Sequence, residues 1–329
     1  MTPAPLNPTP IVPAVTARHP AGRDPIGHLP GPMRVAIWMT LAGLAFSAMG
    51  GLIKFAARDL HPFEVAFFRC FFGLVWMVPW LLRRGPTALR TAKLPLYAAR
   101  AVIGLIGMLA GFYALRYIAL ADATALSFTA PLFATVGAAV VLRETVRRRR
   151  WTATVLGFVG VLIILRPGVT AVDPAALWTL LAAATTAANV LIVKRLTDTE
   201  PTEAVVTWMV VMMTPMTLLA ALPFWETPSL AQTGIMAAIG LCGTLGHLAV
   251  TRGFAAGEAS LVMSFDYLKM PFAAVIGWLA FGELPTPWTF LGAAVIAGSA
   301  AYIAHREAML ARATAGPRAA GETGDQSAP

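Results

Sequence analysis

Charged side chains inside long apolar stretches are the residues of this chain best suited to chemistry. Arg69 lies deep in one such stretch, and Asp266 and Lys269 lie three residues apart in another. A charge within a bilayer costs about 2.5–3.5 kcal/mol on insertion scales, so such groups bind a ligand, move a proton or pair with each other. Asp266 and Lys269 share a helix face and can form an ion pair. That pair either holds the helix in place or opens to bind substrate or exchange a proton, and pairing of Asp266 with Arg69 is a third possibility.

Three further charges, Lys54, Glu64 and Arg100, lie near the ends of their apolar stretches, and we expect their side chains to extend toward water. His247 could carry a proton or only donate a hydrogen bond. The remaining polar and aromatic side chains that could line a substrate path are Ser127, Phe128, Asn189, Trp208, Ser264 and Tyr267. For the tryptophan, stacking on a flat ligand and simple packing are both open.

Several kinds of chemistry lack their sequence signals. The two cysteines, Cys70 and Cys242, form no CxxC pair, and the five histidines are scattered, so no metal site or cofactor is expected. No GxxxxGK[ST] motif is present, which argues against direct drive by ATP. A membrane enzyme acting on lipid would need clustered acids or histidines at the interface. We therefore expect a protein that is not an enzyme.

The composition indicates the elements that must hold these residues. Hydrophobic residues make up 57% of the 329 residues, charged residues only 12%, and the mean hydropathy is +0.70. These values predict an all-α polytopic membrane protein. The ten predicted transmembrane helices are 35–57, 63–82, 95–115, 122–143, 151–167, 174–194, 202–224, 231–254, 258–281 and 286–304.

One passage occurs twice, which predicts an internal duplication. The first copy contains Arg116, Asp122, Ser127-Phe128, Pro131 and Glu144, and the second contains Arg252, Glu258, Ser264-Phe265, Pro271 and Glu283. Each copy lies in a unit of five apolar segments. Because five is odd, the two units must cross a bilayer in opposite senses, which predicts two inverted five-helix repeats. The two prolines are expected to interrupt the fourth and ninth helices, and the two closing glutamates to cap the next helix or pair with basic residues.

The repeats are assigned to residues 34–168 and 174–305, and the tails 1–33 and 306–329 are expected to be disordered. The net charge of +9 could suggest nucleic acid, but the basic residues gather in alternate loops. By the positive-inside rule both termini are cytoplasmic, and no nucleic-acid partner is expected. A bacterial inner membrane is the expected location.

With these features the chain resembles the drug/metabolite transporter superfamily, in its EamA family. The two copies of the passage carry the resemblance, together with the helices TVLGFVGVLIILRPG and TFLGAAVIAGSAAYI that follow them. The segments LHPFEVAFFRCFFG and RRWTATVLGFVGVLIILRPG are similar to S-adenosylmethionine uptake transporters, whereas YALRYIALADATALSFTAPLF is similar to riboflavin transporters.

The resemblance implies a secondary transporter that moves a small polar or amphiphilic metabolite through one central cavity by alternating access. S-adenosylmethionine uptake is the first candidate, and riboflavin uptake or export of amino acids or related metabolites is the alternative; protons are the candidate coupling ion, through Asp266. The residues that the resemblance brings near the path are Arg69, Ser127, Phe128, Ser264, Asp266, Tyr267 and Lys269.

Overall fold

The computed structural model describes residues 25–85, 89–140, 148–166, 173–257, 261–262, 265–299 and 302, and within these ranges every regular element is a helix. The α-helices are α1 (Gly31–Ala56), α2 (Pro62–Arg84), α3 (Leu94–Tyr117), α4 (Leu120–Ser127), α5 (Ala130–Val140), α6 (Arg148–Leu165), α7 (Pro174–Thr197), α8 (Thr202–Ala221), α9 (Leu230–Ala256), α11 (Lys269–Phe281) and a last helix, Pro287–Ser299. Two short 3₁₀ turns, η2 (Leu222–Phe224) and η3 (Asp266–Leu268), adjoin α8 and α11.

Local sequence signals explain where several helices begin. The side chains of His61 and Asp173 accept hydrogen bonds from the backbone at the starts of α2 and α7, each followed by a proline that suits the first helical position. Ser229 and Gln232 form a reciprocal capping box at the start of α9. These three helices therefore begin within one residue of the predicted positions 63, 174 and 231, whereas α1 begins four residues before the predicted position 35.

Six helical segments are long and apolar enough to cross a membrane: α1, α2, α3, α7, α8 together with η2, and α9. Their outer surfaces keep large apolar side chains exposed, among them Leu82, Leu219 and Leu230. Lipid is the environment that makes such exposure favourable. The other apolar helices are shorter within the described residues.

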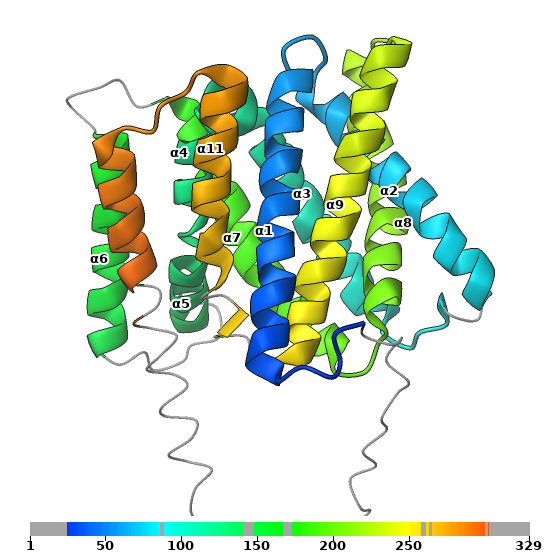
Figure 1. Ribbon diagram of the computed structural model, residues 1–329, viewed down its shortest axis with the longest axis horizontal. Coiled ribbons are helices and arrows are strands. Elements are labelled where there is room, and N and C mark those ends of the chain that lie inside the picture. The colour runs from blue at the N-terminus through cyan, green and yellow to red at the C-terminus, as the bar shows by residue number, and fades with distance from the viewer. Residues whose placement is uncertain are drawn as a thin grey trace, which may run out of the picture.

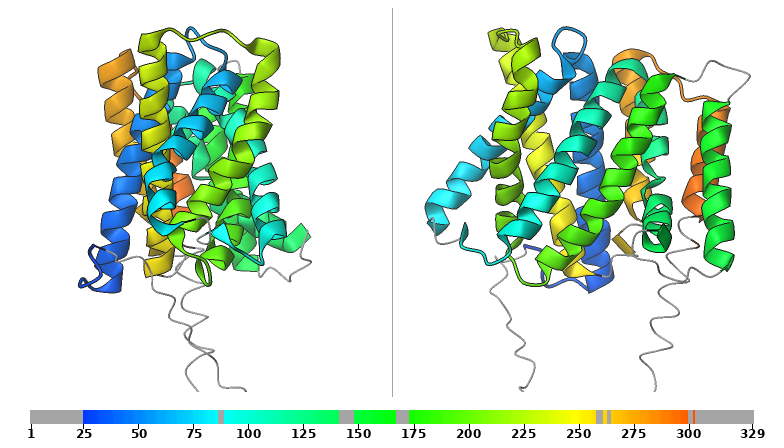
Figure 2. Two further views of the ribbon diagram at one scale, coloured as in Figure 1. Left: turned by 90° about the vertical axis from the view of Figure 1, so that its right-hand side faces the viewer. Right: turned by 180° about the vertical axis from the view of Figure 1, so that it is seen from behind.

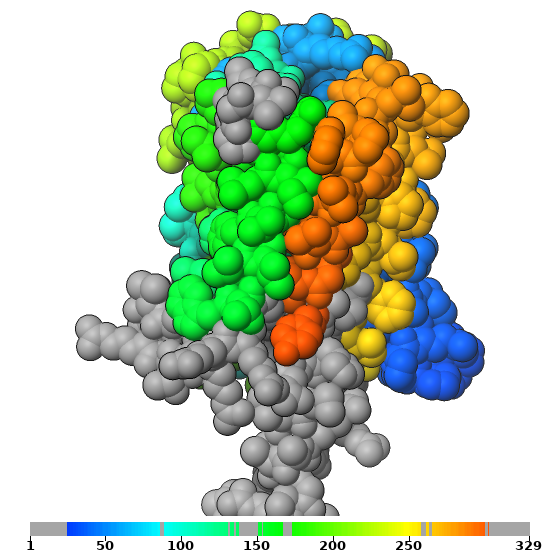
Figure 3. Space-filling model, turned by 90° about the vertical axis from the view of Figure 1, so that its left-hand side faces the viewer, coloured from blue at the N-terminus to red at the C-terminus, as the bar shows by residue number. Residues whose placement is uncertain are grey.

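The helices stand side by side in one bundle, with α1 against α9, α3 against α7 and α2 against α8 (Figure 1, Figure 2). At one end of the bundle, α6 and the last helix lie next to each other (Figure 3). Glycines permit this contact, because a Cβ at Gly160 would lie 2.8 Å from the backbone oxygen of Gly292. Similarly, Gly107 of α3 faces the side chain of Thr185 on α7. Small residues at these positions therefore let neighbouring helices approach closely.

The predicted fourth helix, 122–143, is not continuous. It is divided into α4 and α5, with Phe128 and Thr129 between them. The hydroxyls of Ser127 and Thr129 donate to backbone oxygens three residues earlier, both at 2.7 Å, and compete with continued helix. Pro131 then falls in the first turn of α5, where its missing N–H does no harm.

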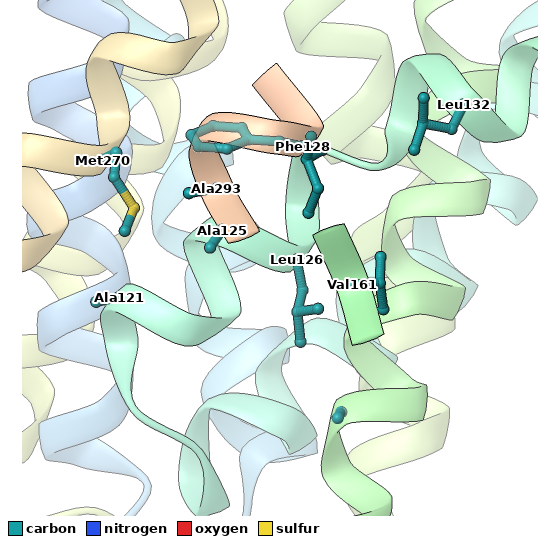
Figure 4. Close-up of a cluster of buried hydrophobic side chains, with 10 residues drawn as sticks. Ala121, Ala125, Leu126, Phe128, Leu132, Val161, Met270 and Ala293 are labelled. Carbon is teal, nitrogen blue, oxygen red and sulfur yellow. The ribbon is translucent and has the colours of Figure 1, made fainter. Parts of the chain in front are cut away.

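The predicted ninth helix, 258–281, is also interrupted just before its proline. Within its described part, the 3₁₀ turn η3 precedes α11, and Pro271 lies in the first turn of that helix. A buried apolar cluster lies beside both interruptions and joins α4, α5, α6, α11 and the last helix. Figure 4 shows Phe128 of this cluster near Ala293 and Ala125. The ring of Phe128 meets that of Tyr267 edge to face, with centroids 4.9 Å apart.

Candidate functional site

A cavity of about 340 Å³ lies at the centre of the bundle and is lined by residues of α1, α2, α3, α7, α8, α9 and the η3–α11 junction. Four predicted site residues, Arg69, Asn189, Asp266 and Lys269, meet at this cavity. Methionine and phenylalanine form much of the remaining lining: Met39, Met49, Met108, Met209, Met213, Phe46, Phe112 and Phe254. This volume and this mixture of apolar surface with few polar groups are those of small-molecule sites.

Arg69 reaches the cavity from α2 and is only 4% exposed. Its guanidinium makes a weak hydrogen bond, 3.7 Å long, to the sulfur of Cys70. Gly243 of α9 leaves room for this group, since a Cβ there would lie 3.0 Å from Nε of Arg69. Pairing of Arg69 with Asp266, one of the sequence alternatives, does not occur among the described residues.

Arg100 also lines the cavity, and this corrects the expectation that its side chain extends to water. It is 4% exposed, donates from Nη1 to the backbone oxygen of Val205 at 2.7 Å, and approaches the sulfur of Met209 at 3.5 Å. Asn189 of α7 fixes the same turn of α3: with its amide oriented to satisfy both groups, it donates to the Arg100 oxygen and accepts from the Gly104 nitrogen, each at 3.2 Å.

Asp266 and Lys269 form the ion pair that their spacing predicts, with 2.6 Å between Oδ2 and Nζ. Their side chains are 21% and 20% exposed, and the Lys269 ammonium also lies 5.7 Å from the ring centre of Phe128. A small adjoining cavity of about 70 Å³ brings together Ser127, Phe128, Tyr267 and this ion pair. Three further residues predicted from the sequence, Ser127, Phe128 and Tyr267, therefore meet the ion pair beside the interrupted helices.

A third cavity, of about 230 Å³, extends from the central one and shares with it seven lining residues: Phe46, Met49, Gly107, Met108, Phe112, Thr186 and Lys269. It carries fewer charges: of the described residues that line it, Lys269 is the one with a charged side chain. The central cavity holds three cations, Arg69, Arg100 and Lys269, and one anion, Asp266, with His247 as a further titratable group. With the histidine neutral, the described residues of this lining carry a net charge of +2.

The remaining predicted residues lie elsewhere. Trp208 is outside the cavity lining: its indole donates to the backbone oxygen of Leu89 at 3.1 Å and packs beside Tyr97, so it has the packing role that the sequence left open. Ser264 falls outside the described residues. Glu64, expected to reach water, is fully buried and accepts from the backbone nitrogen of Glu226 at 3.3 Å.

A polar cluster joins several helices at the upper end of the bundle in Figure 1. Lys54, in the last turn of α1, pairs with Glu283 at 2.5 Å and donates to the backbone oxygen of Ile118 at 2.6 Å. Glu283 in turn accepts from the nitrogen of Leu120 at 3.0 Å, at the start of α4. Glu283 thus pairs with a basic residue, as expected, although that residue lies at a helix end, and it caps the earlier helix α4 and not the next helix that the sequence had suggested. Glu144, its equivalent in the first copy, lies outside the described residues.

The sequence missed Arg100 and the methionine lining of the cavity. The signal for the arginine was available, because it lies six residues inside α3, about 9 Å along the helix at 1.5 Å per residue. Among the described residues, no three histidine, cysteine, aspartate or glutamate side chains gather closely enough to hold a metal ion.

Comparison with known proteins decides the family. The model of the EamA-like transporter family matches residues 33–166 and again 173–304. The chain belongs to the EamA-like transporter family. It is therefore a multi-pass membrane transporter and not an enzyme, within the drug/metabolite transporter superfamily.

Named relatives of this EamA-like transporter differ in substrate. A riboflavin transporter of Vibrio cholerae is 34% identical, over 85% of this chain and 96% of the relative. An S-adenosylmethionine uptake transporter of Rickettsia bellii is 28% identical, over 82% of this chain and 92% of the relative. A solved crystal structure is similar with a TM-score of 0.57 at 18% identity, over 82% of this chain and 98% of the other, which shows a shared fold.

Proposed function

We propose that this protein is a secondary carrier that takes up riboflavin or a closely related flavin by alternating access. The central cavity is the observation that carries the proposal, because residues of both sequence units line it: Arg69 and Arg100 from the first, Asn189 and His247 from the second. A carrier that rocks its two halves against each other needs its binding site between them.

Three observations support the proposed inverted repeat of two units, 34–168 and 174–305. The family model matches the chain twice, once in each unit. The first helices of the two units, α1 and α7, run in opposite directions in Figure 1. The contacts between helices also correspond, with α1, α3 and α4 of the first unit equivalent to α7, α9 and α11 of the second. The α1–α9 contact then has its equivalent in the α3–α7 contact, and the α1–α11 contact in the α4–α7 contact.

The proposed topology has both termini in the cytoplasm of a bacterial cell and the bundle in its inner membrane. The described chain begins and ends at the lower face of Figure 1. The last turns of α2 and α7, which lie toward that face, carry Arg83, Arg84, Lys194 and Arg195. An excess of basic residues marks the cytoplasmic side of membrane proteins, which supports this orientation.

The charge of the cavity favours a flavin over S-adenosylmethionine. Riboflavin is an uncharged molecule with a flat aromatic ring system and several carbonyl and ring-nitrogen acceptors. S-adenosylmethionine is a net cation, with a sulfonium and an ammonium group against one carboxylate, and the described lining residues, of net charge +2, repel a cation. The methionine sulfurs and phenylalanine rings of the cavity can contact a flat ring favourably. The sequence identity is also higher to the riboflavin transporter of Vibrio cholerae.

We further propose Asp266 as the group that couples transport to protons. It lies at the cavity, is paired with Lys269 and is adjacent to the interrupted part of the chain, so opening of the pair would expose a titratable carboxylate. Asp266→Asn tests this in vesicles. Normal accumulation driven by a pH gradient in that variant would contradict the proposal.

Uptake into proteoliposomes tests the function as a whole. We expect saturable uptake of labelled riboflavin, little uptake of labelled S-adenosylmethionine, and faster accumulation when a pH gradient is imposed. Saturable uptake of S-adenosylmethionine without competition by riboflavin would contradict the substrate assignment. Because alternating access is reversible, the same preparation loaded with riboflavin should release it when the gradient is reversed.

A further inference from the structure

Two buried arginines face one cavity without an acidic partner among the described residues. Arg69 on α2 and Arg100 on α3 are each 4% exposed and line the central cavity. The carboxylate in that lining, Asp266, is already paired with Lys269. Burial of charges without counter-charges is unfavourable. A ligand that brings hydrogen-bond acceptors would remove much of this cost.

The hydrogen bonds of the two guanidinium groups leave most of their donors unused. Each guanidinium has five N–H donors. Arg69 makes a weak contact to the sulfur of Cys70, and Arg100 contacts the Val205 oxygen and the Met209 sulfur. Neither arginine is among the buried side chains with an enclosed, unpartnered nitrogen, so the unused donors face the cavity space. The site is therefore equipped to donate several hydrogen bonds to one ligand.

Neighbouring residues hold the arginines in place before any ligand arrives. Asn189 bonds the turn of α3 that carries Arg100, and the bond from Arg100 to Val205 ties the guanidinium to α8. On the other wall, the absence of a side chain at Gly243 allows Arg69 to lie against α9. Donors fixed in this way bind with less loss of side-chain entropy than donors that must first be ordered.

We infer that Arg69 and Arg100 form a two-guanidinium anchor that binds an acceptor-rich edge of the substrate. The chemistry is that of a planar ring edge with carbonyl and ring-nitrogen acceptors, or of an anionic group such as a phosphate on the same ring system. This inference rests on the proposed function, since a flavin supplies such an edge. The planar fork of arginine matches these acceptors, and lysine does not reproduce that geometry.

Ligand binding to the purified full-length protein in detergent tests the anchor. The probes are riboflavin, flavin mononucleotide as the phosphate-bearing analogue, and S-adenosylmethionine as the cationic one. Arg100→Lys and Arg69→Lys keep the charge and much of the volume, whereas Arg100→Gln removes the charge. Arg116→Gln is the matched control, an exposed position near the other end of α3.

We expect each cavity variant to bind riboflavin about ten- to hundred-fold more weakly, the range for a lost hydrogen bond to a charged group, and the control to bind like the wild type. Arg100→Gln should also raise the ratio of S-adenosylmethionine to riboflavin affinity, a change that a purely structural role would not produce.

The outcomes separate the anchor from the proposed function. Unchanged riboflavin affinity in all three folded cavity variants would overturn the anchor and leave riboflavin transport standing. Binding of flavin mononucleotide but not riboflavin, lost in the lysine variants, would support the anchor and contradict riboflavin as substrate. Tighter binding of S-adenosylmethionine than of either flavin to the wild type would overturn both.

Discussion

Replacing Lys54 by methionine should release the polar cluster at the upper end of the bundle. The ammonium pairs with Glu283 at 2.5 Å and donates to the backbone oxygen of Ile118, while Glu283 accepts from Leu120. These bonds join the end of α1, the start of α4 and the segment after α11. Methionine keeps the aliphatic stem but removes the charge, so one substitution breaks both bonds of the ammonium.

The size of the effect follows from the burial of the pair. The Lys54 and Glu283 side chains are 13% and 23% exposed, so the pair is partly buried. A surface ion pair contributes under about 1 kcal/mol, whereas disruption of a buried pair costs about 3–5 kcal/mol, and this pair lies between the two cases. We take about 2 kcal/mol for the lost interaction, and each 1.4 kcal/mol changes an equilibrium tenfold. If this end of the bundle must open during transport, the open population should rise about 30-fold.

The assay is labelling of Thr124→Cys, in the third cavity, by a membrane-impermeant maleimide added outside intact cells. Both native cysteines are first replaced by alanine. Because the lost interaction of about 2 kcal/mol favours the open state, Lys54→Met should raise the labelling rate about 30-fold. Glu283→Gln should raise the rate less, because its side-chain oxygen can still accept from the α4 backbone. Arg116→Gln, an exposed position at the same end, should leave the rate unchanged. An unchanged rate in correctly inserted Lys54→Met protein would refute the reasoning.

Three further predictions test other contacts. Gly243→Ala should weaken riboflavin binding, because the new Cβ would lie 3.0 Å from Nε of Arg69 and would displace the guanidinium. The expected loss is about tenfold, as for roughly one hydrogen bond to a charged group. Gly234→Ala on the same helix has open space around its Cβ, and this variant should bind riboflavin normally. Gly292→Ala should lower the free energy of unfolding by about 1–3 kcal/mol through overpacking against α6, whereas Gly298→Ala should be neutral in thermal unfolding, since nothing lies within 4 Å of its Cβ. Burial, and secondarily a nearby arginine, lower the pKa of His61 below its usual value, and its neutral Nδ1 caps α2. Its stabilisation should therefore be complete above the unfolded pKa of about 6.5 and lost as the pH falls below it, and His61→Asn should remove that part of the pH dependence of the melting temperature.

The part of the site that the sequence predicted is the part set by local spacing. Asp266 and Lys269 pair because three residues bring them to one face of the chain. Pro131 and Pro271 indicate interrupted helices because proline lacks an N–H wherever it occurs. Such features depend on few residues and are visible without a tertiary structure.

The features that sequence reasoning missed depend on which neighbour a side chain meets. Arg100 could have reached water along α3, but the carbonyl of Val205 on α8 lies nearer and binds it. Trp208 has the size and shape of a ligand-stacking residue, yet a loop carbonyl at Leu89 takes its N–H. The distances between helices decide which partner each side chain meets, although the depth of Arg100 in its helix was visible in the sequence.

The interrupted helix of the second unit differs from its counterpart in the first, and this difference affects the relative free energies of the inward- and outward-facing states. In the first unit the proline follows Ser127 by four residues, at Pro131, whereas in the second unit it follows Ser264 by seven, at Pro271. The longer stretch includes η3 and the Asp266–Lys269 ion pair. If the two units were identical, exchanging their conformations would produce inward- and outward-facing states of equal energy. The first unit has no residues with which to form the extra turn. The two facing states are therefore not degenerate, and the empty carrier should rest predominantly in one of them.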